Sequence, residues 1–365
     1  MGIAVIGAII VYAGSKLSKH GDELSEVSGL SSTWIGIILL ALITSIPELA
    51  SCVTAAASGV PDIGMGNVFG SNMFNMFIIA VLDFLQGPGP VLLSVSATQI
   101  LPASLGIFLM SVAAGGIYTA YHYCEVAREA VQDVLPGVAP DAVQKVAQEA
   151  ALGSAAFWGW AFSFVILFGW IVGAFILYKA EQTTISDEEF IHKASPEELR
   201  RIIFKFSIAA LVVIICGIIL VGFAKELAVR SFSIGSMNFT LGNSFVGTII
   251  VAFVTSLPEL VVAISAYRIG AVNMAIANLF GSNTFNIMLI PLMDFVYGSK
   301  SIIANVQPYH ILTAAFAIIL TTVAIMGVVY RSRKSFLFLG WDALAILLFY
   351  LLGTYLIFQI TIQIG

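Results

Sequence analysis

Long apolar stretches separated by short polar segments dominate the chain, and each stretch has about the length of a membrane-spanning helix. A helix needs about 20 mostly apolar residues to cross the hydrocarbon core of a bilayer. On this basis the pattern predicts ten transmembrane helices. Their expected ranges are 2–18, 33–58, 62–87, 92–117, 156–179, 202–224, 243–267, 271–297, 308–330 and 336–361. The predicted fold class is an all-α polytopic membrane protein.

The composition supports this class and excludes several others. The chain has 365 residues, of which 59% are hydrophobic and only 10% charged. These values exclude a water-soluble enzyme, a disordered chain and a nucleic-acid binder. Its three cysteines are scattered and offer neither a disulfide framework nor metal-ligand spacing.

The basic residues predict the orientation of the helices. With both termini outside, eleven of the 16 Lys and Arg residues fall in cytoplasmic loops and five fall outside. The positive-inside rule therefore favours two external termini, and we expect the protein in the plasma membrane. An external insert over 118–155 is expected to form two short amphipathic helices between Cys124 and Ala151, broken at Pro136–Pro140. Capping boxes at Ser186–Glu189 and Ser195–Glu198 predict short helical turns in a cytoplasmic linker, residues 180–201.

Two motifs occur twice, which reveals an internal repeat. Thr44–Leu49 recurs as Thr255–Leu260 and Asn67–Asn75 recurs as Asn278–Asn286, both at an offset of 211 residues, and 21 of 52 aligned positions are identical. Five predicted helices separate equivalent positions, so the second copy enters the membrane from the opposite side. The predicted organisation is two inverted five-helix repeats, residues 1–179 and 202–365, joined by the linker. This architecture is typical of secondary transporters that work by alternating access, with ions bound at the midplane between the repeats.

Glu48 and Glu259 are the most informative residues of the repeated motifs. An ionised carboxylate inside a bilayer costs several kcal/mol unless something compensates it. No Lys or Arg lies within the apolar body of these spans, so the options are protonation or a bound cation. Two converging carboxylates carry a charge of about −2, which matches one divalent cation or several monovalent ones.

The neighbouring polar residues favour a cation site. Pro47 and Pro258 each remove a backbone hydrogen bond and free a carbonyl oxygen. Gly70 and Gly281 are expected to let helices approach closely. Hydroxyls adjoin both glutamates, and the next helix of each repeat carries a polar stripe with a spacing of four: Asn67, Ser71 and Asn75, then Asn278, Ser282 and Asn286. Such oxygen ligands suit hard cations such as Ca²⁺ and Na⁺, whereas Zn²⁺ or copper would favour His or Cys.

The two segments resemble the α-repeats of the cation/calcium exchanger superfamily, specifically its sodium/calcium exchanger branch. That branch is marked by T-S-x-P-E followed by G-S-N-x-x-(N/D), and both copies are present here. The resemblance implies four ion sites, one for Ca²⁺ and the others available to Na⁺, with Glu48 and Glu259 as the central Ca²⁺ ligands. It implies transported Ca²⁺ and Na⁺ and no prosthetic group. The implied metal-site residues also include Thr44, Ser45, Ser71, Asn75, Thr255, Ser256, Ser282 and Asn286, with the carbonyls around Ala41 and Ala252.

One position departs from the family pattern and leaves the coupling ion open. The family often has an acidic residue where this chain has Asn286, so the exact stoichiometry and ion preference do not follow from the resemblance. A proton-coupled antiporter for Ca²⁺ or another divalent cation, and a passive channel, are alternatives of the same fold. An intramembrane hydrolase lacks support because no nucleophile with a base is present. We expect a transporter rather than an enzyme, with the lipid bilayer and ions as partners and a functional monomer.

Two further twinned acids lie near the ends of the third and eighth predicted spans. These residues, Asp83 and Asp294, are again 211 positions apart. Their location at the ends of apolar stretches predicts interfacial anchors or gate residues rather than ion ligands.

Overall fold

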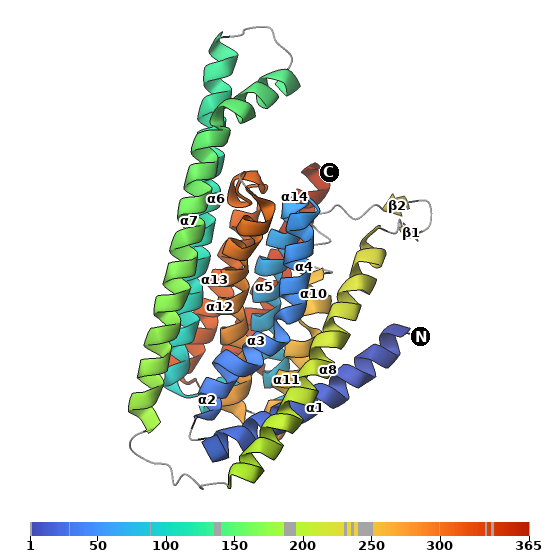
Figure 1. Cartoon of the computed structure of the whole chain (residues 1–365), viewed down its shortest axis with the longest axis vertical. Helices are drawn as coiled ribbons and strands as arrows, with labels where there is room; N and C mark the ends of the chain where they lie inside the picture. Colours follow the sequence, from blue (N-terminus) through green and yellow to red (C-terminus); the bar gives the residue numbers. More distant parts are fainter. Residues whose placement is uncertain are drawn as a thin grey trace.

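The protein folds as a helical bundle (Figure 1). The computed structural model describes residues 2–28, 30–87, 89–134, 140–185, 195–229, 232–234, 237–239, 251–298, 300–332, 334–336 and 339–364. The helices of the first half are α1 (Gly2–Ser28), α2 (Ser32–Trp34), the π-helix η1 (Ile35–Leu40), α3 (Ala41–Thr44), α4 (Ile46–Ala57), α5 (Pro61–Gln86), α6 (Ile100–Val134) and α7 (Pro140–Ile185). Those of the second half are α8 (Pro196–Val229), α10 (Ala252–Thr255), α11 (Leu257–Arg268), α12 (Val272–Tyr297), α13 (His310–Tyr330) and α14 (Trp341–Ile364).

The helices overlap the predicted spans but differ from them in length, and the number of spans that cross the membrane is a separate question. Each of the ten predicted ranges contains helix, but the first part of the range 243–267 lies outside the described residues. Within the described chain, seven helices are long and apolar enough to cross a membrane, or eight if Ser32–Thr44 and Ile46–Ala57 form one span bent by 43°. The all-helical membrane class is thus supported, and the count of ten stays a prediction.

The fourth predicted span begins later than expected. Instead of a helix from residue 92, two 3₁₀ turns precede α6, namely η2 (Val91–Ser94) and η3 (Ala97–Gln99). Ser96 caps the second turn, since its hydroxyl accepts a hydrogen bond from the Thr98 N–H at 3.3 Å. Capping by Ser favours a fresh helix start over continuation of a helix that began earlier.

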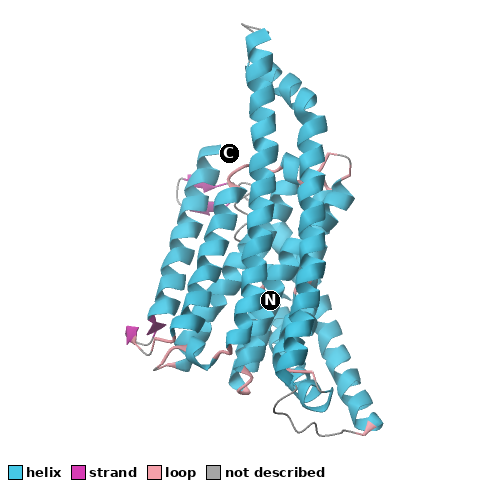
Figure 2. Cartoon of the chain, turned by 90° about the vertical axis from the view of Figure 1, so that its left-hand side faces the viewer, coloured by secondary structure: helices cyan, strands magenta, loops and turns pink. Residues whose placement is uncertain are grey.

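The external insert is also built differently from the prediction. The insert does not form two separate short helices, because α6 continues from its span to Val134 and α7 begins at Pro140. Neither Gly nor Pro occurs between residues 118 and 134, so nothing in that stretch ends the helix. The side chains of Glu125 and Arg128 add an ion pair of 2.9 Å along it. Figures 1 and 2 show α6 and α7 extending together well beyond the other helices of the bundle.

The linker between the repeats is shorter than predicted, because helices extend into it from both sides. The structure has α7 running to Ile185 and α8 starting at Pro196. The Ser195 hydroxyl accepts a hydrogen bond from the Glu198 N–H at 3.2 Å, so this predicted cap is confirmed, but it opens a long helix rather than a short turn. The other predicted box, Ser186–Glu189, lies outside the described residues. We call this end of the bundle, where α7 ends and α8 begins, the linker end, and the opposite one, where α6 ends, the insert end.

Two helices form the centre of the bundle. In the most apolar stretches of α5 and α12, 78% and 83% of the residues are buried, against 22% for α7 and for α14. Because α5 and α12 carry the two polar stripes, the fold places those stripes away from lipid. The described structure also contains a 3₁₀ turn, η5 (Ile303–Asn305), and two short antiparallel hairpins: β1 (Phe232–Ile234) with β2 (Met237–Phe239), and β3 (Ser335–Phe336) with β4 (Leu339–Gly340).

Candidate ion-binding site

Both glutamates lie just after a break in a helix. The backbone turns at Ser45 (φ −89°, ψ 6°) between α3 and α4, and at Ser256 (φ −86°, ψ 9°) between α10 and α11. Pro47 and Pro258 occupy the first turn of the new helix. An N–H group at that position makes no intrahelical bond, so the prediction that each proline removes a backbone hydrogen bond from a continuous helix was wrong. Glu48 and Glu259 therefore both lie in the first turn of a half-helix, whose N–H groups favour negative charge.

Each glutamate is held by a serine of the other repeat. The Ser256 hydroxyl donates to Glu48 Oε1 at 3.0 Å, and the Ser45 hydroxyl donates to Glu259 Oε1 at 3.0 Å. Both glutamates and both serines are fully buried. The serine and the glutamate of one motif thus form hydrogen bonds with the other motif rather than with each other. These bonds connect the two repeats at the centre of the bundle.

The polar stripes complete this arrangement from α5 and α12. Ser71 donates to Glu48 Oε1 at 3.4 Å, and Ser282 donates to Glu259 Oε1 at 3.5 Å. The threonine hydroxyls again cross between the repeats: Thr255 donates to Asn67 Oδ1 at 3.0 Å and Thr44 donates to Asn278 Oδ1 at 3.4 Å. The structure therefore brings the predicted hydroxyl residues of both motifs together around the two carboxylates.

The carbonyls of Ala41 and Ala252 lie at the same breaks. Each accepts the backbone N–H of the serine four residues later at 3.0 Å. The Thr44 hydroxyl is 3.4 Å from the first carbonyl and the Thr255 hydroxyl 3.2 Å from the second. These two oxygens are thus engaged by their own helices, and the sequence-based expectation that they bind ions stays a prediction.

Four asparagines link the repeats next to the carboxylates. Asn72 Nδ2 donates to the Asn283 carbonyl and Asn283 Nδ2 to the Asn72 carbonyl, both at 3.3 Å. Asn75 Nδ2 donates to Asn283 Oδ1 at 3.0 Å, and Asn286 Nδ2 donates to Asn72 Oδ1 at 3.1 Å. Sequence reasoning missed the roles of Asn72 and Asn283, although their occurrence in both motifs was a signal available for them.

Four buried oxygens at this centre have no hydrogen-bond partner among the described residues. They are the second carboxylate oxygens, Glu48 Oε2 and Glu259 Oε2, and the amide oxygens of Asn75 and Asn286. No salt bridge involves either glutamate within the described chain. A buried carboxylate oxygen without a donor or counter-charge is costly, and a bound cation relieves that cost. The set of carboxylate, hydroxyl and amide oxygens suits a hard cation.

Close helix packing next to the site depends on one of the predicted glycines. A Cβ atom at Gly281 of α12 would lie 2.4 Å from the Ile37 carbonyl oxygen of η1. That distance is far inside van der Waals contact, so only glycine fits where α12 crosses η1. The expectation of close approach is confirmed for Gly281, and it fixes the position of Ser282 beside the glutamates.

Asp83 and Asp294 lie near the ends of α5 and α12, as predicted, and their position relative to the membrane surface stays a prediction. Both are buried, with 1% and 0% of their surface exposed. Asp83 accepts the N–H groups of Val91 at 2.5 Å and Gly340 at 2.7 Å. Asp294 accepts the Ile302 N–H and the hydroxyls of Ser163 and Ser301. Each aspartate thus caps the backbone of a loop that folds back over the end of its helix and covers it.

Comparison with known proteins places this arrangement in a family. The chain is 26% identical over 362 residues to the sodium/calcium exchanger MaX1 of Methanosarcina acetivorans, a match that covers 98% of each chain. A match of 30% identity to the putative antiporter CaxA of Alkalimonas amylolytica covers 30% of this chain and 36% of that relative. The fold is similar to that of the sodium-calcium exchanger NCX_Mj soaked with 10 mM Na⁺ and 10 mM Sr²⁺, with a TM-score of 0.62, 19% identity and 97% of each chain covered. The sequence model of the sodium/calcium exchanger protein family matches residues 1–179 and 209–360. The chain therefore belongs to the sodium/calcium exchanger branch of the cation/calcium exchanger superfamily and is an integral membrane antiporter of cations.

Proposed function

We propose that this protein exchanges Na⁺ for Ca²⁺ by alternating access, with both ions bound between the repeats. The observation that carries the proposal is the pair of fully buried glutamates whose second oxygens have no partner among the described residues. Two ionised carboxylates balance one Ca²⁺. The flanking ligands are hydroxyls and amides, which coordinate Na⁺ but do not titrate at physiological pH.

The proposed ion ligands are the twelve residues predicted from the sequence. Glu48 and Glu259 are the central Ca²⁺ ligands, and the serines, threonines and asparagines around them supply neutral oxygens to Na⁺ as well. Both repeats that build the site belong to the same chain, and a functional monomer is part of the proposal. The family relationship supports transported ions rather than a bound prosthetic group.

Flux measurements in proteoliposomes test the driving ion. Vesicles loaded with ⁴⁵Ca²⁺ should release it when external Na⁺ replaces choline at fixed pH, because Na⁺ on the opposite side exchanges for Ca²⁺. Choline is the matched control for ionic strength. Release driven by a pH gradient alone, with Na⁺ inert, would show that the glutamates carry protons and that the antiporter is proton-coupled. Release without any cation on the opposite side would identify a channel.

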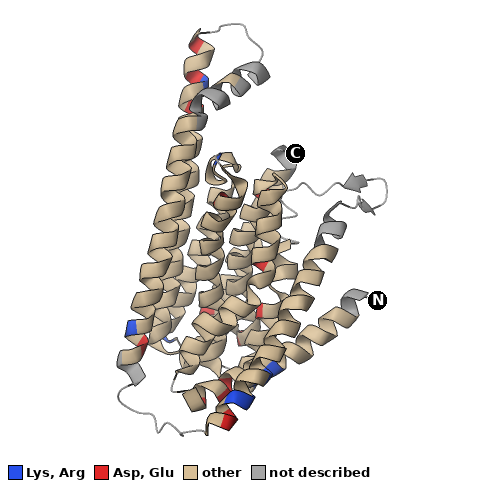
Figure 3. Ribbon diagram, in the orientation of Figure 1, with Lys and Arg blue, Asp and Glu red and all other residues tan. Residues whose placement is uncertain are grey.

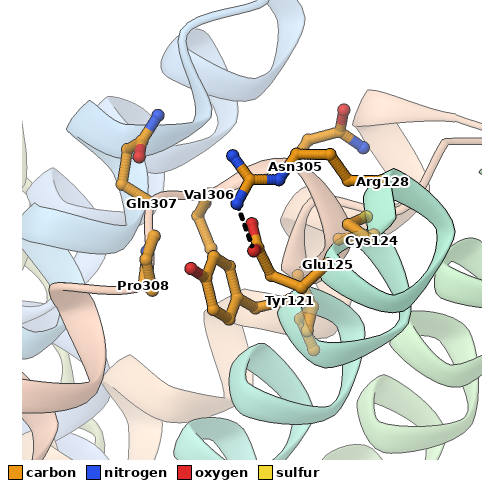
Figure 4. A pocket seen from close by; sticks show the side chains of 10 residues that line it. Tyr121, Cys124, Glu125, Arg128, Asn305, Val306, Gln307 and Pro308 are labelled. Carbon is orange, nitrogen blue, oxygen red and sulfur yellow. Dashed lines mark hydrogen bonds and ion pairs between the residues drawn. The ribbon is translucent and has the colours of Figure 1, made fainter. Parts of the chain in front are cut away.

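We further propose that both termini and the insert end face the outside of the plasma membrane. Cys124 lies on α6 at the insert end, beside Glu125 and Arg128 in a pocket of about 160 Å³ (Figure 4). It is partly exposed, whereas Cys52 and Cys216 are buried.

An impermeant maleimide added to intact cells should therefore label the wild-type protein at Cys124. The Cys124→Ser variant should lose this labelling, which assigns the signal to one residue. Labelling that requires permeabilised cells would place the insert end in the cytoplasm and reverse the orientation.

A further inference from the structure

A second charged site, separate from the two glutamates, lies at the linker end, where α1 and α8 pack together. A cleft of about 440 Å³ opens between these helices. Its polar lining consists of Lys16, Lys19, His20 and Glu23 of α1 and Lys205 of α8, with Tyr12 beside them. In the ribbon of Figure 3, positions of basic residues (blue) lie near this end of the bundle. A cleft of this size accommodates a small ligand or a lipid headgroup.

The charges of the cleft leave two lysines without an acidic partner. Glu23 is 3.8 Å from Lys19 Nζ and 2.8 Å from His20 Nδ1, so its carboxylate is shared by residues of its own helix. Within the described chain, Lys16 and Lys205 make no ion pair, and the Lys16 ammonium instead lies 5.6 Å from the centre of the Tyr12 ring. The lining carries three Lys and one Glu, which gives a net charge of about +2 with His20 neutral. This charge is complementary to an anion.

The surroundings of the cleft identify the kind of anion. Two of the lining residues, Tyr12 of α1 and Ile208 of α8, are 68% and 49% exposed. Close to them in sequence on the same helices, Val11 and Leu211 are 53% and 56% exposed. Exposed apolar residues on helices of a membrane protein contact acyl chains. Basic pockets between transmembrane helices on the cytoplasmic side bind anionic lipid headgroups, and the linker end is the predicted cytoplasmic end. We propose that the cleft between α1 and α8 binds an anionic phospholipid, with its phosphate between Lys16 and Lys205 and its chains along the exposed faces.

Native mass spectrometry of the full-length protein with added lipid tests this proposal. The wild-type protein should retain dioleoylphosphatidylglycerol under conditions that remove dioleoylphosphatidylcholine. The double variant Lys16→Gln/Lys205→Gln should bind phosphatidylglycerol on the order of thirtyfold more weakly, since each basic residue near an anionic headgroup contributes about a fivefold change. The matched control is Lys179→Gln/Lys334→Gln, which removes two exposed lysines elsewhere at the predicted cytoplasmic side. It should bind like the wild type.

Three results would overturn the assignment. Equal weakening in both double variants would mean diffuse attraction to surface charge rather than a site. If the wild-type protein retained phosphatidylcholine as well as phosphatidylglycerol, the lipid would be held by apolar contacts alone. This comparison needs no variant. Displacement of the lipid by soluble glycerol 3-phosphate at equal concentration would mean a site for a small soluble anion. Size-exclusion profiles and thermal unfolding of each variant should match those of the wild type, which checks that none of the four lysines is needed for folding.

Discussion

Replacing either central glutamate by glutamine should reduce Ca²⁺ transport to the background of empty vesicles. Glu48→Gln and Glu259→Gln keep the size of the side chain and an oxygen that can accept the serine hydroxyl of the other repeat. Each variant removes one of the two negative charges facing the ion. In a water-excluded site the attraction between a carboxylate and a divalent cation is worth several kcal/mol, which corresponds to more than a hundredfold in affinity. The two variants should be equally defective because their surroundings are equivalent.

The measurement is Na⁺-dependent ⁴⁵Ca²⁺ flux in proteoliposomes that contain equal amounts of each protein. Glu129→Gln is the matched control, since it makes the same chemical change at an exposed position of α6 near the insert end. It should transport like the wild type. Unchanged flux in either of the two site variants, with normal size-exclusion behaviour, would show that the Ca²⁺ site lies elsewhere.

A membrane potential should shift the Ca²⁺ gradient that the protein maintains. Two carboxylates with one Ca²⁺ are neutral, whereas the same site with three Na⁺ carries one positive charge, so a three-to-one cycle moves one net charge with Na⁺. One charge moved through 100 mV corresponds to about 2.3 kcal/mol, or roughly a fiftyfold change in the Ca²⁺ concentration ratio at equilibrium. This dependence separates three-to-one exchange from electroneutral cycles.

Vesicles with potentials set by K⁺ and valinomycin provide the test. At fixed Na⁺ concentrations, Ca²⁺ release should accelerate and proceed further when the interior is negative. An equilibrium Ca²⁺ ratio that does not change with potential would identify exchange of two monovalent cations per Ca²⁺. Such a result would leave the Ca²⁺ ligands in place and revise only the number of Na⁺ ions.

The centre of the site was predictable because the informative residues are repeated in the sequence. Glu48 and Glu259 occur in matching motifs within apolar stretches, and a buried charge requires compensation wherever it lies. The hydrogen bonds from the serine of one repeat to the glutamate of the other were not predictable. Helical spacing relates Ser45 to Glu48 of its own segment, yet the serine bonds Glu259, because tertiary packing of the two breaks decides which side chains meet.

The burial of Asp83 and Asp294 was not predictable from the sequence for a different physical reason. Hydropathy places both residues near helix ends, where water is the default environment. The structure instead shows loops folded back onto both helix ends, so that backbone N–H groups of Val91 and Ile302 replace water. The path of a loop is not encoded in the periodicity of hydrophobic residues. In the insert, helix was predicted, but the continuation of α6 from its span to Val134 was not. The change to polar residues marks the end of a membrane span, whereas a helix continues until a residue such as Gly or Pro ends it.

The reciprocal bonds between Asn72 and Asn283 bear on how the protein divides its time between two conformations. Each residue gives its amide to the carbonyl of the other at the same distance, so exchanging the two halves leaves the pair unchanged. In the proposed alternating access, the hydrogen bonds of such a pair have the same energy in the inward-open and outward-open states. They therefore contribute nothing to the free-energy difference between the two states. The resting preference for one state is therefore set by whatever the two halves do not share, foremost the extended α6 and α7 pair, which has no counterpart in the described part of the second half.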